Sequence, residues 1–397
     1  MAIVKLAEVC EKIGSGATPR GGKEAYCDEG ISLVRSQNVL DFNFSKEGLA
    51  FINDEQAKKL SNVEVHSGDV LLNITGDSVA RACLMDDDYL PARVNQHVTI
   101  IRGNSHKIMN GYVLYYLQWR KEYLLQLASA GATRNALTKA MIEQLELDLP
   151  PLDSQQQIVA ILDSLQSKIQ LNQKINDNLE QQAQAIYHER FETVSPNDLP
   201  YDWRIVTLGE VVTISNKSFN PLKEPEILLE HYSIPAFDEA RFPVFELSTS
   251  IKSNKFIIDA SCFMISKLNP TTKRVWKPYC LTEDAVCSTE FIVYKAKDQA
   301  ITDFLYSVID SGSFSNFMCS HVTGSTGSRQ RTTPAETLSY KLILPSENEL
   351  AKFQSLVSPM YAQMRINAIE NDKLKRLRDS LLPKLMSGEI DVSAVQL

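Results

Sequence analysis

Two stretches of the chain repeat apolar side chains at the spacing of a long amphipathic helix. In residues 154–190, two rows of positions seven residues apart are mostly apolar, and a shift of 195 residues gives two matching rows in the second half of the chain. Such rows, sustained over roughly four to five heptads, are typical of a coiled coil. At ~1.5 Å per residue the first helix would be about 55 Å long. The pattern predicts two long helices joined along an apolar seam.

Four asparagines interrupt this seam. Asn172 and Asn176 lie in the rows of the first helix, and Asn367 and Asn371 lie at the same places in the second. A buried asparagine costs stability but fixes the register and orientation of paired helices. If the helices pair antiparallel, Asn172 meets Asn371 and Asn176 meets Asn367. The alternative is that the four side chains lie slightly off the seam and face water.

Shorter apolar patterns also recur in both halves. Continuous apolar runs at 68–74 and 261–268 are typical of buried strands, and a second such pair lies at 97–102 and 290–295. We therefore expect comparable strands in the two halves.

Two further matches mark the beginning and the end of each half. IVKLAEV (3–9) and IVTLGEV (205–211) agree at five of seven positions and are strand-like. GATRNALT (131–138) and TGSRQRTT (326–333) are polar turns that both lead into an apolar run ending in proline and then into a long helix. A shared frame with a divergent interior predicts a tandem repeat of two domains that do one job on two different targets.

These patterns divide the chain into four segments. We expect a first domain at 1–150, a first spacer helix at 151–195, a second domain at 196–345, and a second spacer helix with a C-terminal tail at 346–397. An antiparallel pair of helices with a domain at the start of each would have approximate two-fold symmetry. Half-sites read from one face of duplex DNA lie ~34 Å apart. The arrangement would suit a bipartite DNA target with a gap.

Composition restricts the classes of partner. The 397-residue chain has a formal net charge of −8, so contact with nucleic acid must come from local basic clusters. Its seven cysteines include no CxxC pair, which fits a reducing cytoplasm better than a disulfide framework or a zinc site. No apolar run approaches the ~18 residues that span a bilayer. We expect a soluble cytoplasmic protein that does not contact membranes.

No catalytic constellation emerges from the sequence. GSGATP lacks the third glycine of a dinucleotide-binding motif, and LNPTTK (268–273) lacks the Pro-aromatic pair that follows Asn-Pro in adenine methyltransferases. The six histidines are dispersed without the spacing of metal ligands. We therefore expect no catalytic residue, metal or cofactor on this chain.

Polar loops are the better candidates, and their residue types suit DNA. Lys and Arg reach phosphates, and Arg, Asn and Gln can read base edges. The predicted set in the second half is Lys267, Asn269, Thr271, Thr272, Lys273, Arg274, Lys277, Ser328, Arg329, Gln330 and Arg331; in the first half it is Arg20, Lys23, Arg35, Ser36, Gln37, Asn38, Asn73, Thr75, Arg81, Arg134 and Asn135.

Each loop also has a purely structural interpretation. Residues 267–277 would be an ordinary charged hairpin with Trp276 in the core, Gly21-Gly22 would form a turn, and Ser36 would cap a turn or helix. Because Arg134 and Arg329 occur in both frames, we expect them to anchor phosphates and not to read bases.

At this point the chain resembles a known family, the specificity subunits of Type I restriction–modification systems. The resemblance covers nearly the whole chain and is weakest at 220–245. It rests on GSGATPRGG (14–22), ISLVRSQNV (31–39), GDVLLNITGD (68–77), NQHVTIIR (95–102), GATRNALTKAMIEQLELDLPPLDSQQQIVAILDSL (131–165), ILPSENELAKFQSLV (343–357) and LLPKLMSGEIDV (381–392).

The resemblance implies two target recognition domains of α/β (α+β) class, held apart by two helices. It implies a complex on double-stranded DNA with two modification (methyltransferase) subunits, which carry S-adenosylmethionine, and with restriction/translocase subunits where cleavage occurs. The chain itself would be non-catalytic. Two alternatives remain open: a methyltransferase or nuclease with an unrecognised site, and a coiled-coil adaptor that binds only protein.

Overall fold

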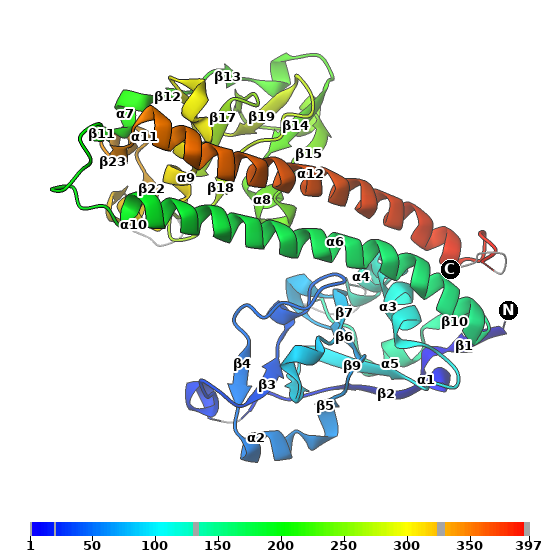
Figure 1. Cartoon of the computed structure of the whole chain (residues 1–397). Coiled ribbons are helices and arrows are strands. Elements are labelled where there is room, and N and C mark those ends of the chain that lie inside the picture. The colour runs from blue at the N-terminus through cyan, green and yellow to red at the C-terminus, as the bar shows by residue number, and fades with distance from the viewer. Residues whose placement is uncertain (1, 20, 130–134, 324–329, 393–397) are drawn as a thin grey trace. The chain divides into compact units, whose positions relative to one another are not determined.

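A computed structural model describes residues 2–19, 21–129, 135–323 and 330–392 of the chain. It contains two compact units (Figure 1). The first unit comprises residues 1–169 and 373–397, and the second comprises residues 170–372. Each unit holds small sheets, short helices and a part of both long helices.

The first unit is built around an antiparallel sheet whose two central strands are almost wholly buried. In addition to this sheet, a two-stranded ribbon joins the start of the domain to its end. The ribbon pairs β1 (Ala2–Lys5) with β10 (Glu146–Leu149), and the sheet has the order β2 (Cys10–Ser15), β9 (Val98–Gly103), β6 (Val70–Asn73), β7 (Ala82–Leu84).

A second sheet of the first unit contains its one described parallel pair, β3 with β8. Its order is β4 (Ala50–Ile52), β3 (Ile31–Val34), β8 (Ala92–Val94), β5 (Glu64–Val65). The short helix α2 (Asp54–Lys59) begins where the Asn53 side chain accepts a hydrogen bond from the Gln56 amide.

Three short helices complete the first unit: α3 (Asn110–Trp119), α4 (Lys121–Ser129) and α5 (Lys139–Glu143). The core combines α3 and the antiparallel sheet with the far end of the chain. Leu382, Leu385, Met386 and Val392 are buried in this core. The C-terminal segment therefore folds as part of the first unit.

The second unit repeats this plan. The ribbon pairs β11 (Arg204–Thr207) with β23 (Lys341–Leu344), and the antiparallel sheet has the order β12 (Val212–Ser215), β20 (Phe291–Ala296), β17 (Cys262–Ser266), β18 (Val275–Trp276). The second sheet has the order β13 (Ser218–Phe219), β16 (Lys255–Ile257), β19 (Ala285–Ser288), β14 (Leu228–Tyr232), β15 (Val244–Leu247), with β14 and β19 parallel. Its helices are α8 (Ile234–Ala240), α9 (Thr302–Asp310), α10 (Gly312–Ser320) and α11 (Pro334–Thr337).

The prediction of comparable strands is confirmed, because β6 matches β17 and β9 matches β20 in sheet position. The expected strands at 3–9 and 205–211 are only half right. Each strand ends at its fourth described residue and continues as one helical turn, α1 (Leu6–Val9) or α7 (Leu208–Val211). The Glu210 carboxylate accepts hydrogen bonds from the Thr207 amide and hydroxyl, which starts the turn.

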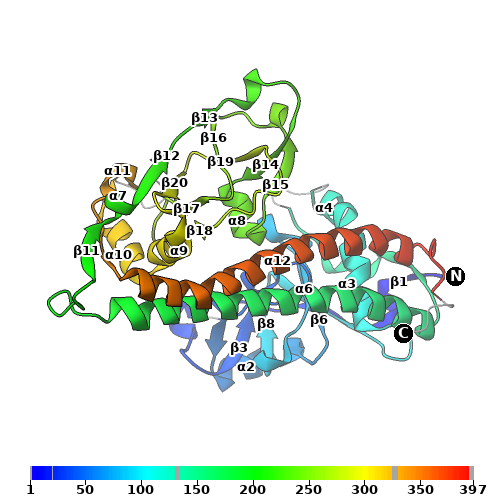
Figure 2. The same ribbon diagram turned by 45° about the horizontal axis from the view of Figure 1, so that its top comes forward.

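Two long helices carry the heptads. α6 runs over Leu152–Tyr187 and continues as a π-turn at His188–Glu192, and α12 runs over Glu347–Met386. In the second unit they lie next to each other in both views (Figures 1 and 2). Seam residues Ala183, Phe353 and Val357 are fully buried. The predicted coiled coil is confirmed, and the heptad rows expected at 154–190 lie within the helical span 152–192.

Candidate nucleic-acid interface and coiled-coil seam

The asparagines of the seam form the predicted pairs. Asn172 donates to the Asn371 side-chain oxygen at 2.9 Å, and Asn367 donates to the Asn176 side-chain oxygen at 2.8 Å. Because the partner number falls as the residue number rises, α6 and α12 run antiparallel here. Asn172 and Asn367 are buried. The alternative that these side chains face water does not hold for them.

In the first unit, the polar loop after β6 lies beside the turn that leaves the domain. Thr75 forms a β-bridge with Ala136, and the Gly76 amide donates to the Asn135 carbonyl at 3.2 Å. The Asn135 side chain is exposed. Two segments about 60 residues apart in the chain therefore present one surface.

The second unit has the same juxtaposition at the equivalent place. Leu268 forms a β-bridge with Arg331, and the Asn269 amide donates to the Gln330 carbonyl at 2.9 Å. Asn269 has a positive φ of 48°, which turns the chain sharply after β17. We call this pair of segments, 267–274 with 330–332, the loop–turn surface of the second unit.

Several cations of this surface are engaged within the protein. Arg274 holds Asp238 through two hydrogen bonds of 2.5 and 2.8 Å, and Arg331 holds Glu290 through two of 2.9 and 3.1 Å. Lys277, three residues beyond this surface, pairs with Asp303. These bonds fix the loop, and the indole of Trp276 is buried beneath it, as the structural interpretation of this hairpin predicts.

Lys273 reaches a buried carboxyl. Its ammonium lies 2.8 Å from the Asp310 carboxylate and also donates to the Asp310 carbonyl. Burial raises the pKa of Asp310 to about 6, and the nearby lysine opposes this rise without cancelling it. Lys273 therefore anchors the loop to the end of α9.

The side chains of several other predicted residues have no partner among the described residues. Within the described part of the chain, no hydrogen bond or ion pair involves the side chains of Lys267, Thr271, Thr272, Gln330, Asn135 or Arg81. Thr271 and Thr272 are exposed, and Lys267 and Gln330 are half-buried. These groups are free to donate to phosphates or bases.

The RSQN segment of the first unit is internally bonded. Asn38 is buried and donates to the Ser45 carbonyl, while Arg35 and Gln37 both donate to the Gly48 carbonyl, at 2.6 and 2.9 Å. Ser36 begins the 3₁₀ turn Ser36–Asn38. In this structure, these side chains hold a turn together.

Asn73 joins the same turn from β6. It is fully buried, and its amide donates to the carbonyls of Ser36 and Val39 at 2.9 and 3.1 Å. An unpartnered carbonyl buried there would cost stability, so the asparagine satisfies two backbone groups of the turn.

Two polar residues next to Thr75 escaped the sequence prediction. The Thr75 hydroxyl lies 2.6 Å from His97 Nδ1, and Gln96 links the other ring nitrogen of His97 to the Thr18 hydroxyl. Gln96 is exposed. The polar run Asn95-Gln96-His97 immediately before a buried strand was the available signal.

Some predicted residues lie outside the described part of the chain. These are Arg20, Arg134, Ser328 and Arg329, together with the side chain of Lys23. Within the described residues, no group of three or more His, Cys, Asp or Glu could hold a metal ion. None of the helices in the described ranges is long and apolar enough to cross a bilayer.

Comparison with known proteins finds similarity to one family. Residues 1–181 match the Type I restriction modification DNA specificity domain. The MjaIX specificity subunit of Methanocaldococcus jannaschii is 24% identical, covering 98% of this chain and 93% of its own length. The HindI specificity subunit of Haemophilus influenzae is 22% identical, covering 91% and 94%.

A solved structure has the same fold. The S subunit of the Type I restriction-modification system from M. genitalium aligns with a TM-score of 0.59 at 13% identity, covering 97% of this chain and 96% of that chain. The two units and the paired long helices have the fold of that subunit. The chain is thus similar over nearly its whole length to Type I restriction enzyme specificity subunits, and its first 181 residues match the model of their DNA specificity domain.

Proposed function

We propose that this chain reads a bipartite, gapped DNA target for a Type I complex, with one half-site for each unit. The observation that carries the proposal is the repeated juxtaposition of a polar loop with the exit turn, at Thr75–Ala136 and at Leu268–Arg331. The frame is the same in both units, whereas the side chains on the loops differ. Two domains that bind different half-sites need a common frame with different side chains on their loops.

The side chains of the loop–turn surface have two different roles, contact with DNA and stabilisation of the loop. Lys267, Thr271 and Gln330 have unused donors, which suits contact with phosphates and base edges. Arg274 and Arg331 hold the surface in shape through carboxylates of the protein. A preformed loop loses less conformational entropy on binding than a mobile one.

The proposal assigns methyl transfer to other subunits. Two modification subunits would bind S-adenosylmethionine and carry out the reaction, and restriction/translocase subunits would act on unmodified DNA. Similarity to specificity subunits supports this division, in which the chain has no catalytic activity alone.

The long helices offer a surface for those subunits. Leu171 on α6 and Ile366 on α12 are 53% and 56% exposed, and they occupy equivalent positions of the repeat because 195 residues separate them. Each directly precedes a seam asparagine, Asn172 or Asn367. Equivalent residues of an antiparallel pair face the same side, so an exposed apolar strip suits a partner helix.

The docking proposal predicts that two surface variants differ in their co-purification with the modification subunits. Changing Leu171 and Ile366 together to Glu should prevent co-purification of the modification subunits, because two charges would enter an apolar interface. Leu222→Glu is the matched control, since Leu222 is 60% exposed and belongs to the 3₁₀ turn Pro221–Lys223 and to neither long helix. Loss of co-purification in the control alone would contradict this surface.

DNA reading is tested with the assembled complex. Its affinity for DNA should fall steeply and linearly with the logarithm of salt concentration, because phosphate contacts release counterions. The same modification subunits without this chain should show no preference for any gapped sequence. An assembled complex without salt-dependent binding would support the protein-only adaptor.

A further inference from the structure

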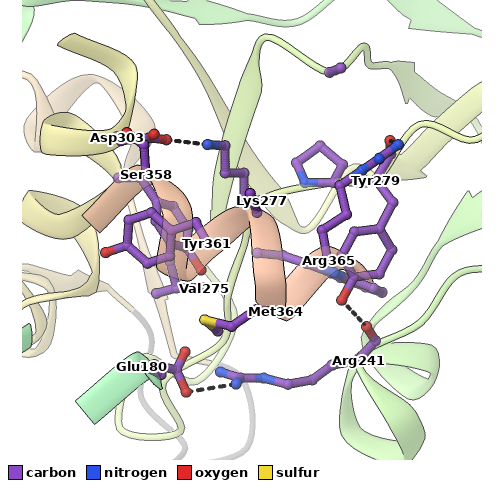
Figure 3. Close-up of a pocket in the computed structure, with 15 residues that line it drawn as sticks. Glu180, Arg241, Val275, Lys277, Tyr279, Asp303, Ser358, Tyr361, Met364 and Arg365 are labelled. Carbon is purple, nitrogen blue, oxygen red and sulfur yellow. Dashed lines mark hydrogen bonds and ion pairs between the residues drawn. The ribbon is translucent and has the colours of Figure 1, made fainter. Parts of the chain in front are cut away.

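The second unit contains a cavity that DNA reading and subunit docking do not explain. Its volume is about 340 Å³, near the lower end of the ~300–1,000 Å³ typical of ligand pockets. It lies between the recognition domain, which contributes β18, α9 and Arg241 directly after α8, and residues of α6 and α12 (Figure 3). All of its walls belong to residues 170–372.

The inner wall of the cavity is apolar and aromatic. Trp276 and Tyr361 are 3% and 6% exposed, and Val275 is also buried. Met364 lies between Arg241 and Lys277 in the view of Figure 3. Apolar and aromatic walls of this kind favour the ring of a small organic molecule over a bare inorganic ion.

The charged residues of the cavity leave one cation in excess. Arg241 pairs with Glu180 at 2.8 Å and Lys277 pairs with Asp303, so both carboxylates of the lining already have partners. The guanidinium of Arg365 donates to the Tyr279 carbonyl at 3.0 Å. Among the described residues, no carboxylate pairs with Arg365.

Arg365 is therefore placed to receive an anion. A guanidinium has five N–H donors, and among the described residues Arg365 has a single acceptor, the Tyr279 carbonyl. Arg365 is exposed, whereas Trp276 and Tyr361 are buried. The guanidinium therefore lies toward solvent, and the apolar surface of the cavity lies inside. This polarity matches a ligand with an apolar ring and one anionic end.

We propose that this cavity binds a small organic anion with an aromatic or apolar body and a phosphate or carboxylate group, which Arg365 recognises. The ligand would touch the recognition domain and both long helices at once. Binding would therefore stabilise the packing of that domain on the helices within the unit.

The probe for this site is 1-naphthyl phosphate, with 1-naphthol as its uncharged counterpart. Calorimetric titration of the purified full chain, without DNA, should show saturable binding of the phosphate. The affinity for 1-naphthol should be lower by about tenfold or more, because 1-naphthol cannot form the charge-assisted bond. Equal affinity for the two probes, or no binding of either, would overturn the proposal.

Three variants locate the binding. Arg365→Gln should weaken binding of 1-naphthyl phosphate by about tenfold or more. Lys373→Gln, which removes the same charge from an exposed position two turns further along α12, should leave it unchanged. Ala362→Trp fills the rim of the cavity from an exposed position and should abolish binding without removing a charge.

Circular dichroism of each variant shows whether it is folded before titration. Binding that survives both Arg365→Gln and Ala362→Trp would place the probe elsewhere and contradict the assignment. Because DNA is absent, a negative result here leaves the proposed reading of DNA untouched, and failure of DNA binding leaves this titration interpretable.

Discussion

At the scale of single residues, Lys267 and Arg274 lie only seven positions apart in one loop, yet their surroundings differ. The Arg274 side chain is 13% exposed and bonded twice to Asp238, whereas the Lys267 side chain has no partner among the described residues. A positive charge in a polar loop can thus serve the protein's own structure or remain available to a ligand.

This difference predicts different effects on DNA binding. Lys267→Gln should weaken binding to all sequences and reduce the salt slope by about one, because one phosphate contact is lost. Arg274→Gln should leave the slope unchanged and lower the free energy of unfolding by about 0.2–1 kcal/mol, the range for a partly exposed ion pair. Titrations at several salt concentrations measure the slopes, and a reversed pattern would refute the division.

Asp310 predicts a dependence of stability on pH. Its folded pKa is about 6 against an ordinary 3.8, so between these values the folded state keeps a proton that the unfolded state has released. The free energy of unfolding should therefore fall as pH rises through this window, and the loss should be complete above it. Asp310→Asn should lack this fall in urea unfolding measured across the window.

A second variant checks the cause. Lys273 lowers the pKa of Asp310, so Lys273→Met should move the fall in stability to higher pH. Parallel pH profiles for the wild type and Asp310→Asn would show that this carboxyl does not govern the dependence.

The sequence could not reveal these partners. Asp238 lies 36 residues from Arg274, and Glu290 lies 41 residues from Arg331. An ion pair over such a separation depends on the folded chain, because nothing in the local pattern links the two residues. For the same reason Asn38 and Asn73 resembled surface side chains in sequence, although they are buried.

At the scale of elements, local periodicity was informative where a single element carries it. The heptads predicted α6 and α12, and the continuous apolar runs predicted β6, β9, β17 and β20. The four-residue turns α1 and α7 were missed because capping and tertiary contacts decide such short helices. The pairing of a polar loop with a distant turn was also unpredictable, since a β-bridge joins segments far apart in sequence.

The seam asparagines give a prediction for the helix pair. Changing Asn172 and Asn371 together to Leu should raise the unfolding temperature, because two buried amides become apolar contacts. It should also allow other registers or oligomers, since the amide pair no longer excludes them. Thermal unfolding and sedimentation velocity measure both effects, and a less stable variant that remains a single species would contradict this role.

For the whole molecule, the duplicated frame is the central feature. The matching strand orders, parallel pairs and loop–turn contacts make the second unit a variation of the first. The repeat in sequence predicted this duplication, but the loops between the repeated markers share no pattern that identifies target bases. Duplicated architecture with unlike loops is the basis for expecting two unlike half-sites.

The most direct measurement is a base-resolution map of adenine methylation in host DNA with and without the gene for this chain. The account predicts the loss of one bipartite, gapped methylated motif when the gene is absent. Its return on complementation would reveal both half-sites together. Retention of every methylated motif, in a host shown to express the chain and its modification subunits, would contradict the proposed reading of DNA.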